Sequence, residues 1–373
     1  MKFHRPLVLL AGALAIFAAV SPIDFGIDGL ALGDHLWSRM VFSLLGIATL
    51  RDSQDTPQPA NAAWNVPFAT LLAAVEIVEL AHSDGPRGWG FFCAVGAVWL
   101  CAWRSVDLIV ARTPALGHRA RFMRILAPLV FGATLLVLWE TLTLSLGVPK
   151  VILPAPSAIL LKLVTSIPML AADFVQTVQG IAAGYVIGCG AGVLVAILID
   201  RVPFLQRGLL PLGNLVSALP IVGIAPIMVM WFGFDWQSKA AVVVIMTFFP
   251  MLVNTVAGLS AAGHMELDLM KTYGASYGET LLHLRLPAAL PFIFNGLKIN
   301  STLALIGAIV AEFFGTPIVG MGFRINTEVG RMNIDMVWAT IVVAGLAGSL
   351  FYALLAAMEK RATFWHASYR ERA

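Results

Sequence analysis

The sequence predicts an all-α polytopic membrane protein, and three observations support this fold class. Charged residues make up only 12% of the chain, whereas a soluble domain carries roughly 25%. The mean hydropathy is +0.86, and several apolar runs reach the ~20 residues that a helix needs to cross a bilayer. Because backbone groups in lipid must pair within their own segment, and the alternation of a membrane barrel is absent, we expect helices as the spanning elements.

The first 115 residues contain four candidate spans and a polar linker. Residues 1–22 would also fit a secretory signal peptide, and we favour an uncleaved first span. The second span is short and carries Arg39, so lying along the membrane interface is its alternative. We treat 1–115 as an N-terminal membrane extension without an assigned role. The four expected spans are 6–23, 36–50, 64–81 and 89–110.

A cluster of arginines separates this extension from a six-span core. Arg112, Arg119, Arg121 and Arg124 fall close together in the sequence, and such a cluster beside a span marks the cytoplasmic side. We place the core at 116–373. Its expected spans are 122–147, 174–199, 209–232, 238–261, 290–312 and 335–358.

The distribution of basic residues predicts the orientation of the core. If the first core span begins on the cytoplasmic side, Arg201 and Arg207 also lie on that side, together with the segment 263–290 and the basic C-terminal tail. Arg324 and Arg331, in the last outer loop, oppose the positive-inside rule, but the two heaviest basic clusters still lie inside. We therefore expect both termini in the cytoplasm.

The stretch "LDLMKTYGASYGETLLHLRLPAALP", Leu267 to Pro291, interrupts two apolar runs with a polar, helix-like sequence. Asp268, Lys271 and Thr272 form a first short polar arm, and Gly274 permits a break in the backbone. The order within this stretch indicates more than a connector.

A second arm follows from Tyr277 to Leu284, with leucines on one side. Pro287 and Pro291 are expected to end the helical run and to restart it as the next span. The segment 263–290 is therefore predicted to form two short helices at an angle, held beneath the membrane.

This segment resembles the cytoplasmic signature of the transmembrane subunits of binding-protein-dependent ABC importers. That signature is Glu-Ala-Ala, three residues, Gly, nine residues, Ile, one residue and Leu-Pro; this chain has Asp-Leu-Met, Gly, Leu and Leu-Pro at the same spacing. Leu269 and Met270 replace the two small alanines, which implies a wider partner groove or a shifted docking angle. The residues that the resemblance implicates in coupling to an ATPase are Asp268, Leu269, Met270, Lys271, Thr272, Gly274, Ala275, Ser276, Leu284, Leu286 and Pro287.

Four further motifs resemble the branch of this family that carries nitrate, taurine and aliphatic sulfonates. They are "KTYGAS", "LPAALPFIFNGLKI", "LPAPSAI" and "AEFFG". The branch also includes importers of pyrimidine vitamin precursors and riboflavin, and "LMKTYGAS" slightly favours a heterocyclic vitamin precursor over a sulfonate-like anion. The resemblance covers about 122–365. It implies a type I ABC importer transmembrane core of about six helices, here preceded by an extra N-terminal membrane region of about four.

The resemblance also implies partners. Cytoplasmic ATP-binding-cassette ATPase subunits would bind the segment 263–290. A second permease copy, identical or different, would complete the core. A periplasmic or surface-tethered solute-binding protein would deliver the solute to this inner-membrane subunit of a prokaryote. The chain has no G-x-x-x-x-G-K-[ST] phosphate loop, so ATP and Mg would be bound by the partner ATPase, with no cofactor in this chain. Membrane lipid surrounds the spans, and we expect no nucleic-acid partner.

Ionisable and polar residues inside spans are candidates for the transport pathway, because burying them in a membrane is costly. Glu312, Lys298 and Asn300 of the fifth core span are the pathway candidates. Two alternatives stay open. Glu312 would then be an interfacial carboxylate that contacts the outer loop, and Lys298 would extend toward the cytoplasmic headgroups.

Two glutamates of the third span support a different class of transporter. Glu76 and Glu79 are three residues apart and share a helix face. Together with Glu312 they would serve a proton-coupled secondary transporter, which is the alternative function. A solvated helix end would explain the pair equally well.

Four glycines of the second core span predict close helix packing. Gly180, Gly184, Gly188 and Gly192 recur at every fourth residue and line one face. Small residues let helix backbones approach each other in lipid. We expect a packing seam, with a substrate-lining face as the alternative.

The sequence shows no catalytic or metal-binding pattern. Cys93, Cys101 and Cys189 lack metal-ligand spacing, and so do the seven histidines. No Ser/His/Asp set lies in one compartment. We therefore expect a transport subunit rather than an enzyme, with no catalytic residue and no metal.

Overall fold

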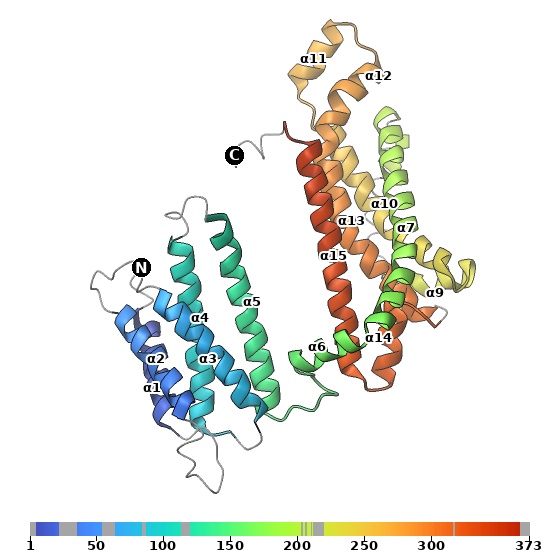
Figure 1. Ribbon diagram of the computed structural model, residues 1–373. Coiled ribbons are helices and arrows are strands. Elements are labelled where there is room, and N and C mark those ends of the chain that lie inside the picture. The colour runs from blue at the N-terminus through green and yellow to red at the C-terminus, as the bar shows by residue number, and fades with distance from the viewer. Residues whose placement is uncertain are drawn as a thin grey trace. The chain divides into compact units, whose positions relative to one another are not determined.

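In the computed structural model, every regular element among the described residues is a helix (Figure 1). The helices form two compact units, Met1–Ala158 and Ile159–Ala373. The described residues are 5–21, 36–53, 64–83, 87–112, 120–202, 204–205, 207–209, 211, 220–315 and 318–365.

The first unit is a bundle whose helices follow the four expected spans and the first span of the core. Helices α1 and α2 pack together, α1 and α3 both contact α4, and α5 packs on α3 and α4. Its core includes the fully buried Phe42, Leu45, Ile77 and Phe91. The helices are α1 (Arg5–Val20), α2 (Leu36–Asp52), α3 (Asn65–His82), α4 (Trp89–Arg112) and α5 (Ala120–Ser145).

The boundary between the compact units falls after α5, later than the expected functional boundary between 115 and 116. Two contacts explain the later position. Helix α5 packs on α3 and α4, and Glu140 of α5 accepts hydrogen bonds from the Ser157 N–H (2.9 Å) and hydroxyl (2.6 Å) at the start of α6 (Pro156–Thr165). The functional division at 115/116 stays a prediction, and Arg119 lies outside the described residues.

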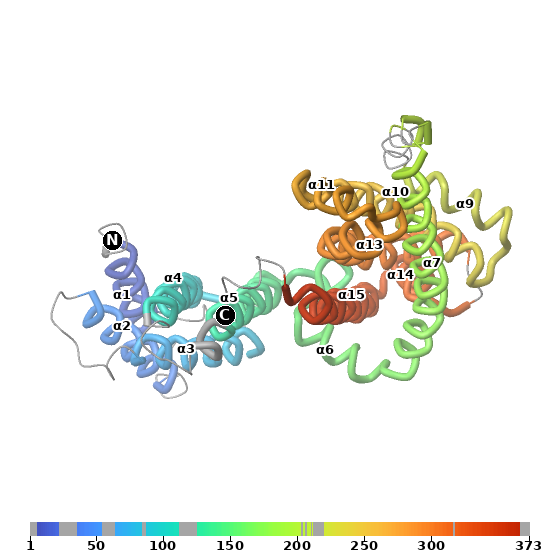
Figure 2. Tube along the Cα trace, turned by 90° about the horizontal axis from the view of Figure 1, so that it is seen from above, coloured from blue at the N-terminus to red at the C-terminus, as the bar shows by residue number. Residues whose placement is uncertain are grey.

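The second unit contains four long helices and several short ones. The long helices are α7 (Ile167–Arg201), α10 (Trp236–Leu259), α13 (Leu286–Phe314) and α15 (Ile334–Ala362). Figure 2 looks along them and shows α13 between α10 and α15, while α7 packs on α10. The short elements are α9 (Ile221–Phe232), α11 (His264–Thr272), α12 (Tyr277–Thr280), the π-helical turn η3 (Leu281–Arg285) and α14 (Met321–Gly330).

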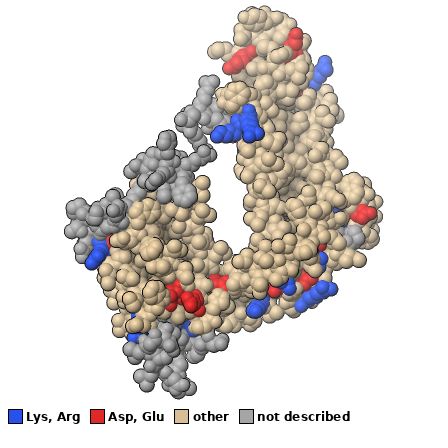
Figure 3. Space-filling view, viewed as in Figure 1, with Lys and Arg blue, Asp and Glu red and all other residues tan. Residues whose placement is uncertain are grey.

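The second unit has two distinct ends, which we call the α11 end and the α14 end (Figure 1). Helices α7, α10 and α15 run from the α14 end toward the α11 end, and α13 returns in the opposite direction. On the face drawn in Figure 3, charged side chains of this unit gather toward its ends, and the middle of the long helices is uncharged. This distribution suits helices that cross a bilayer.

Seven helical segments of the described part are long and apolar enough to cross a membrane. They are α3, α4, α5, α7, α10, the continuous run from α12 to α13, and α15. The predicted spans 6–23, 36–50 and 209–232 contain the shorter helices α1, α2 and α9, of 16, 17 and 12 residues. Residues 210 and 212–219 of the third of these spans lie outside the described residues. The structure therefore has the predicted fold class.

Candidate functional site

The segment 263–290, which we call the loop segment, begins with a helix that has no buried residue. This helix, α11, exposes Met265 (84%) and Leu269 (55%), and Tyr273 just beyond its end is 81% exposed. The three side chains follow at intervals of four residues, so they lie on one face. Asp268 and Lys271 form an ion pair of 3.0 Å that is also well exposed. Helix α11 therefore presents a continuous apolar row without an intramolecular partner in the described part of the chain.

A glycine cap ends α11. Gly274 adopts a φ of +68°, a left-handed conformation that glycine adopts without strain. The Ala275 N–H donates to the Met270 carbonyl (3.0 Å), and the Gly274 N–H donates to the Lys271 carbonyl (2.9 Å). These two bonds form a Schellman motif. The break predicted at Gly274 is therefore present, and its geometry is specified by backbone hydrogen bonds.

The second arm begins with a reciprocal cap and continues without interruption into the next long helix. The Glu279 N–H donates to the Ser276 hydroxyl (3.3 Å), and the Ser276 N–H donates to the Glu279 carboxylate (2.6 Å). This capping box satisfies two backbone donors that the start of a helix leaves unpaired. Helices α12, η3 and α13 then follow one another from Tyr277 to Phe314.

The prediction that Pro287 and Pro291 end the helical run is wrong. Residues Leu281–Arg285 form a π-helical turn, in which the Leu286 N–H donates to the Leu281 carbonyl. Pro287 directly follows this turn, as the second residue of α13. Pro291 lies inside α13. A π turn thus replaces the expected break.

At the α11 end, the loop segment is attached to the last turn of α7. The Tyr277 hydroxyl donates to the Asp200 carboxylate at 2.9 Å, and Arg285 forms an ion pair with the same oxygen. The Arg201 guanidinium lies 5.2 Å from the centre of the Tyr277 ring, within the range of a cation–π contact. The loop segment is therefore bonded to α7 in addition to α10 and α13, which precede and follow it in the chain.

At the α14 end, Glu312 is at the centre of a buried hydrogen-bond network. Its exposed fraction is 1%, and it accepts from the Thr177 hydroxyl (2.9 and 3.0 Å) and from the Gly322 N–H (2.7 Å). Thr177 in turn accepts from the Met321 N–H (3.0 Å). The network joins α7, α13 and the start of α14.

An ion pair between the fully buried Asp173 and the largely buried Arg324 extends this network. Asp173 of α7 accepts from Arg324 Nε (2.7 Å) and from the Gly320 N–H (2.9 Å). The hydrogen bond to Asp173 raises the pKa of Arg324 above its ordinary value, so the guanidinium stays charged. Arg324 also lies 3.6 Å from Glu328. Arg324, which opposes the positive-inside rule, therefore has a buried anionic partner on α7.

The other two pathway candidates also contact neighbouring helices. Lys298 donates to Glu359 of α15 at 2.7 Å, and both side chains are largely buried. Asn300 is fully buried and donates to the Thr247 carbonyl (2.8 Å) and toward Cys189 Sγ (3.2 Å). Its Oδ1 has no partner among the described residues. A pathway role for the three candidates stays a prediction.

The four glycines of α7 all face α10. A Cβ atom on Gly184 would lie 2.5 Å from Val243 Cβ, and one on Gly188 would lie 2.1 Å from Thr247 Oγ1. Gly180 and Gly192 meet Lys239 and Met251 of α10 in the same way. Both helices thus approach more closely than side chains would permit, which agrees with the expected packing seam.

In the first unit, Glu76 and Glu79 have different environments. Glu76 is buried and accepts a hydrogen bond from the Ser38 hydroxyl of α2, whereas Glu79 is exposed. The two carboxylates therefore do not form a jointly buried pair. Within the described residues, no group of three or more His, Cys, Asp or Glu side chains is arranged to hold a metal ion.

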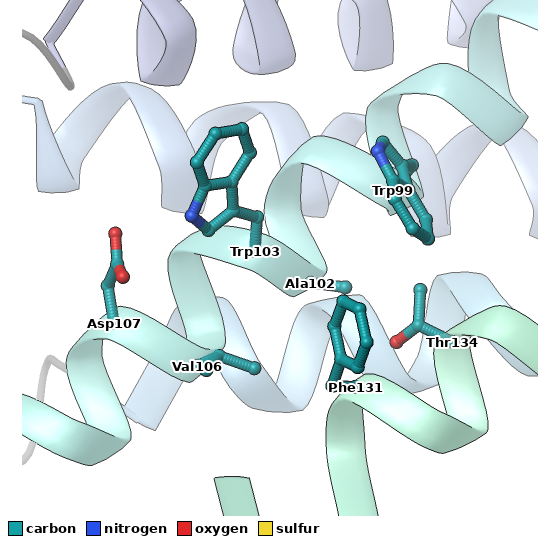
Figure 4. Close-up of a pocket in the computed structure, with 7 residues that line it drawn as sticks. All are labelled: Trp99, Ala102, Trp103, Val106, Asp107, Phe131 and Thr134. Carbon is teal, nitrogen blue, oxygen red and sulfur yellow. The ribbon is translucent and has the colours of Figure 1, made fainter. Parts of the chain in front are cut away.

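A cavity of about 370 Å³ lies between α4 and α5 of the first unit. Figure 4 shows Trp99 and Phe131 close together and Asp107 beside Trp103, and the first two rings are 6.4 Å apart between centres. Most of the lining is apolar. It consists of Trp99, Ala102, Trp103, Val106, Asp107, Phe131 and Thr134.

The sequence analysis missed the residues that connect the helix ends. Asp173 is an acidic residue inside α7, and a span predicted to start at 174 left it in a loop. Had the span been extended, Asp173 would have stood out as an intramembrane carboxylate. Asp200 has no comparable signal, because an acid at a helix end needs no special explanation.

Comparisons with known proteins place these features in a family. Residues 188–364 match the family described as binding-protein-dependent transport system inner membrane component. The chain is 33% identical over 221 residues to a probable ABC transporter permease protein of Haemophilus influenzae. The matched region covers 59% of this chain and 90% of the relative.

Two further relatives have named solutes. The chain is 31% identical over 246 residues to the formylaminopyrimidine transport permease protein of Halalkalibacterium halodurans, over 66% of this chain and 98% of the relative. It is 28% identical over 237 residues to the riboflavin transport system permease protein of Chloroflexus aurantiacus, over 63% of this chain and 88% of the relative.

The fold and the family together define a multi-pass inner-membrane transport subunit, a transport component rather than an enzyme. The chain belongs to the family of binding-protein-dependent transport system inner membrane components, the permease subunits of ABC transporters. Members of this family work in general with an ATPase and a solute-binding protein.

Proposed function

We propose that this chain forms the translocation pathway of an ATP-driven importer for a small organic solute. The names of two relatives, which concern a formylaminopyrimidine and riboflavin, support a heterocyclic vitamin precursor as the solute class. A sulfonate-like, taurine-like or nitrate-like anion is the alternative class. Ligand-induced melting shifts of the solute-binding protein that works with this chain, measured with riboflavin, a formylaminopyrimidine and taurine, distinguish the two classes.

The observation that carries this proposal is the exposed apolar row of α11. Met265, Leu269 and Tyr273 lie on one helix face and are 55% to 84% exposed. A helix that presents such a row binds well in a groove of a partner protein. We propose that this groove belongs to a cytoplasmic ATPase subunit, where Leu269 and Met270 occupy the space that two alanines fill in typical relatives.

The caps on both sides of Gly274 support a mechanical role for the loop segment. The Schellman motif and the capping box satisfy the backbone groups at the break. A segment with satisfied caps transmits a displacement instead of unfolding under it. Closure of the ATPase pair would therefore reach α13 through α12 and η3, in a rigid-body change between two states.

A second copy of the permease, identical or different, would complete the pathway. Helix α15 leaves Leu346, Leu350 and Leu354 exposed by 55% to 74%, at intervals of four residues. Such a row suits either lipid or another permease copy. In this arrangement both termini and the loop segment face the cytoplasm.

A cysteine crosslink tests the docking of α11. In the complex of this chain with its ATPase, a cysteine at Leu269 is expected to crosslink to the ATPase in high yield, because its side chain lies on the exposed row. A cysteine at Val329, exposed by 47% at the α14 end, is the matched control and is expected not to crosslink.

Two results would contradict the proposal. Crosslinking from Val329 but not from Leu269 would reverse the orientation. Uptake that persists when the ATPase has lost its catalytic glutamate, but collapses with an uncoupler, would favour the proton-coupled secondary transporter.

A further inference from the structure

We propose that Asp200 is a positioning residue that ties the loop segment to α7, so that α7 and α13 move together when an ATPase displaces α11. The inference rests on the proposed docking of α11 and adds a third helix to the path of the force. Without this tie, the loop segment would be joined only to α10 and α13, the long helices that precede and follow it in the chain.

Asp200 binds the loop segment at two points through one carboxylate oxygen. Tyr277, the first residue of α12, donates its hydroxyl to this oxygen at 2.9 Å, and Arg285, the last residue of η3, forms an ion pair with it. Hydrogen bonds to an ionised acceptor are about twice as strong as neutral ones. Asp200 therefore contacts both ends of the stretch Tyr277–Arg285, which lies between the break at Gly274 and α13.

Burial distinguishes this tie from the other ion pair of the loop segment. The Asp200 and Arg285 side chains are exposed by only 14% and 23%, whereas Asp268 and Lys271 are exposed by 71% and 78%. A solvent-exposed pair contributes little to stability, and a shielded pair costs much more to break. Of these two pairs, the one with Asp200 is suited to transmit force.

The position of the π turn gives the tie a mechanical purpose. The turn η3 forms the second half of the stretch Tyr277–Arg285, and its hydrogen bonding is weaker than that of an α-helix. A push on α11 would be expected to bend the chain there. Because Asp200 bridges the turn, the push is passed to α7 as well as along the turn into α13.

The α14 end carries a matching connection between the same two helices. Thr177 of α7 donates to Glu312 of α13. Thr177 and Asp200 are 23 residues apart on α7, and Arg285 and Glu312 are 27 residues apart on the continuous run from η3 into α13, which are helical lengths of about 35 and 40 Å. The two helices are thus connected at both ends across the expected thickness of a membrane, and they would move as one body.

Hydrogen exchange of the full chain in lipid nanodiscs measures the tie directly. Asp200→Asn is expected to speed amide exchange in Tyr277–Arg285 by about 5- to 30-fold, because the ionic part of the bridge is lost. Exchange in α10 is expected to stay unchanged. Asp335→Asn, which removes a carboxylate at the α14 end of the same unit, is the matched control and should leave Tyr277–Arg285 at its original rate.

Conservative and reciprocal variants separate positioning from general loss of structure. Tyr277→Phe removes one hydrogen bond and keeps the ring beside Arg201, so a smaller increase in exchange is expected. The charge swap Asp200→Arg with Arg285→Asp should bring the rate back toward that of the original chain. The inference is wrong if the double variant exchanges as fast as the single variants Asp200→Arg and Arg285→Asp.

The complex with the ATPase and the loaded solute-binding protein supplies the functional readout. Asp200→Asn is expected to keep the Leu269 crosslink to the ATPase but to lose most of the stimulation of ATP hydrolysis by the binding protein, at least about 5-fold. Full stimulation in this variant would overturn the inference. A missing crosslink in the chain that carries only the cysteine at Leu269, with Asp200 intact, would instead refute the proposed docking, so the two failures are distinguishable.

Discussion

Glu312 illustrates how one buried carboxylate organises the α14 end. It accepts hydrogen bonds from Thr177 of α7 and from the Gly322 N–H, and Gly320 approaches it so closely that a Cβ there would lie 2.8 Å from the Glu312 carboxyl carbon. A buried anion without such donors would be very costly. The contacts agree with the alternative in which Glu312 binds the outer loop, and a direct role in the pathway stays a prediction.

Substitution of Glu312 tests these two roles. Glu312→Ala leaves the Gly322 N–H unpaired and opens a cavity, so it is expected to lower the free energy of unfolding by about 2 to 4 kcal/mol. Glu312→Gln retains a carbonyl acceptor and should cost less than half of this. Thermal unfolding of the purified chain measures both. A normal melting temperature with abolished uptake in Glu312→Gln would assign the charge to the pathway instead.

The loop segment shows at the scale of an element how backbone conformation directs a surface. Gly274 has a positive φ, and a Cβ added there would meet no atom within 4 Å. A larger residue at this position would therefore act through backbone strain and not through a clash. The direction in which α11 leaves α12 depends on this single conformation.

Replacements of Gly274 are expected to follow their tolerance for the left-handed region. Gly274→Val costs roughly 1 to 2 kcal/mol of strain and should lower the Leu269 crosslink to the ATPase about 5- to 10-fold without reducing membrane insertion. Gly274→Asn should be milder, because asparagine adopts this region more readily. Gly278→Ala, in a helical position with open space, is the control. If Gly274→Val, Gly274→Asn and Gly278→Ala crosslink equally well, docking does not depend on a left-handed conformation at residue 274.

At the scale of the whole molecule, the compact units and the proposed functional core do not coincide. Helix α5 packs on α3 and α4 in the first unit, yet we propose that the functional core begins at 116. Both statements hold if α5 is a core helix that also carries the N-terminal extension. In a membrane such an attachment requires close packing, because lipid supplies no hydrophobic drive between helices.

Two truncations decide where the core begins. Deletion of 1–115 is expected to keep the Leu269 crosslink and ATP-driven uptake, because it removes α1–α4 and leaves the α5 surface to lipid. Deletion of 1–145 also removes α5 and should abolish uptake, while α6 stays intact. Membrane-inserted protein is quantified for both. Equal uptake by the two truncated chains would move the start of the core toward 159.

Several features of this protein were predictable because they depend on neighbouring residues. Hydropathy over about twenty residues located the membrane helices, and the four-residue glycine spacing located the seam of α7. The break at Gly274 followed from the lack of a Cβ. The prolines of α13 were misjudged, because a π turn in Leu281–Arg285 depends on how the chain is held on both sides.

The connections between helix ends were not predictable in the same way. Asp200 and Arg285 are 85 residues apart, and Asp173 and Arg324 are 151 residues apart. No local pattern indicates which acid will meet which base across such distances. By itself, the sequence determined the helical membrane fold and the position of the polar loop segment between two spans, because hydropathy and helix signals are local. Only the tertiary structure decided which buried charges join α7, α13 and α14, because desolvated ion pairs form only where the packed helices bring their ends together.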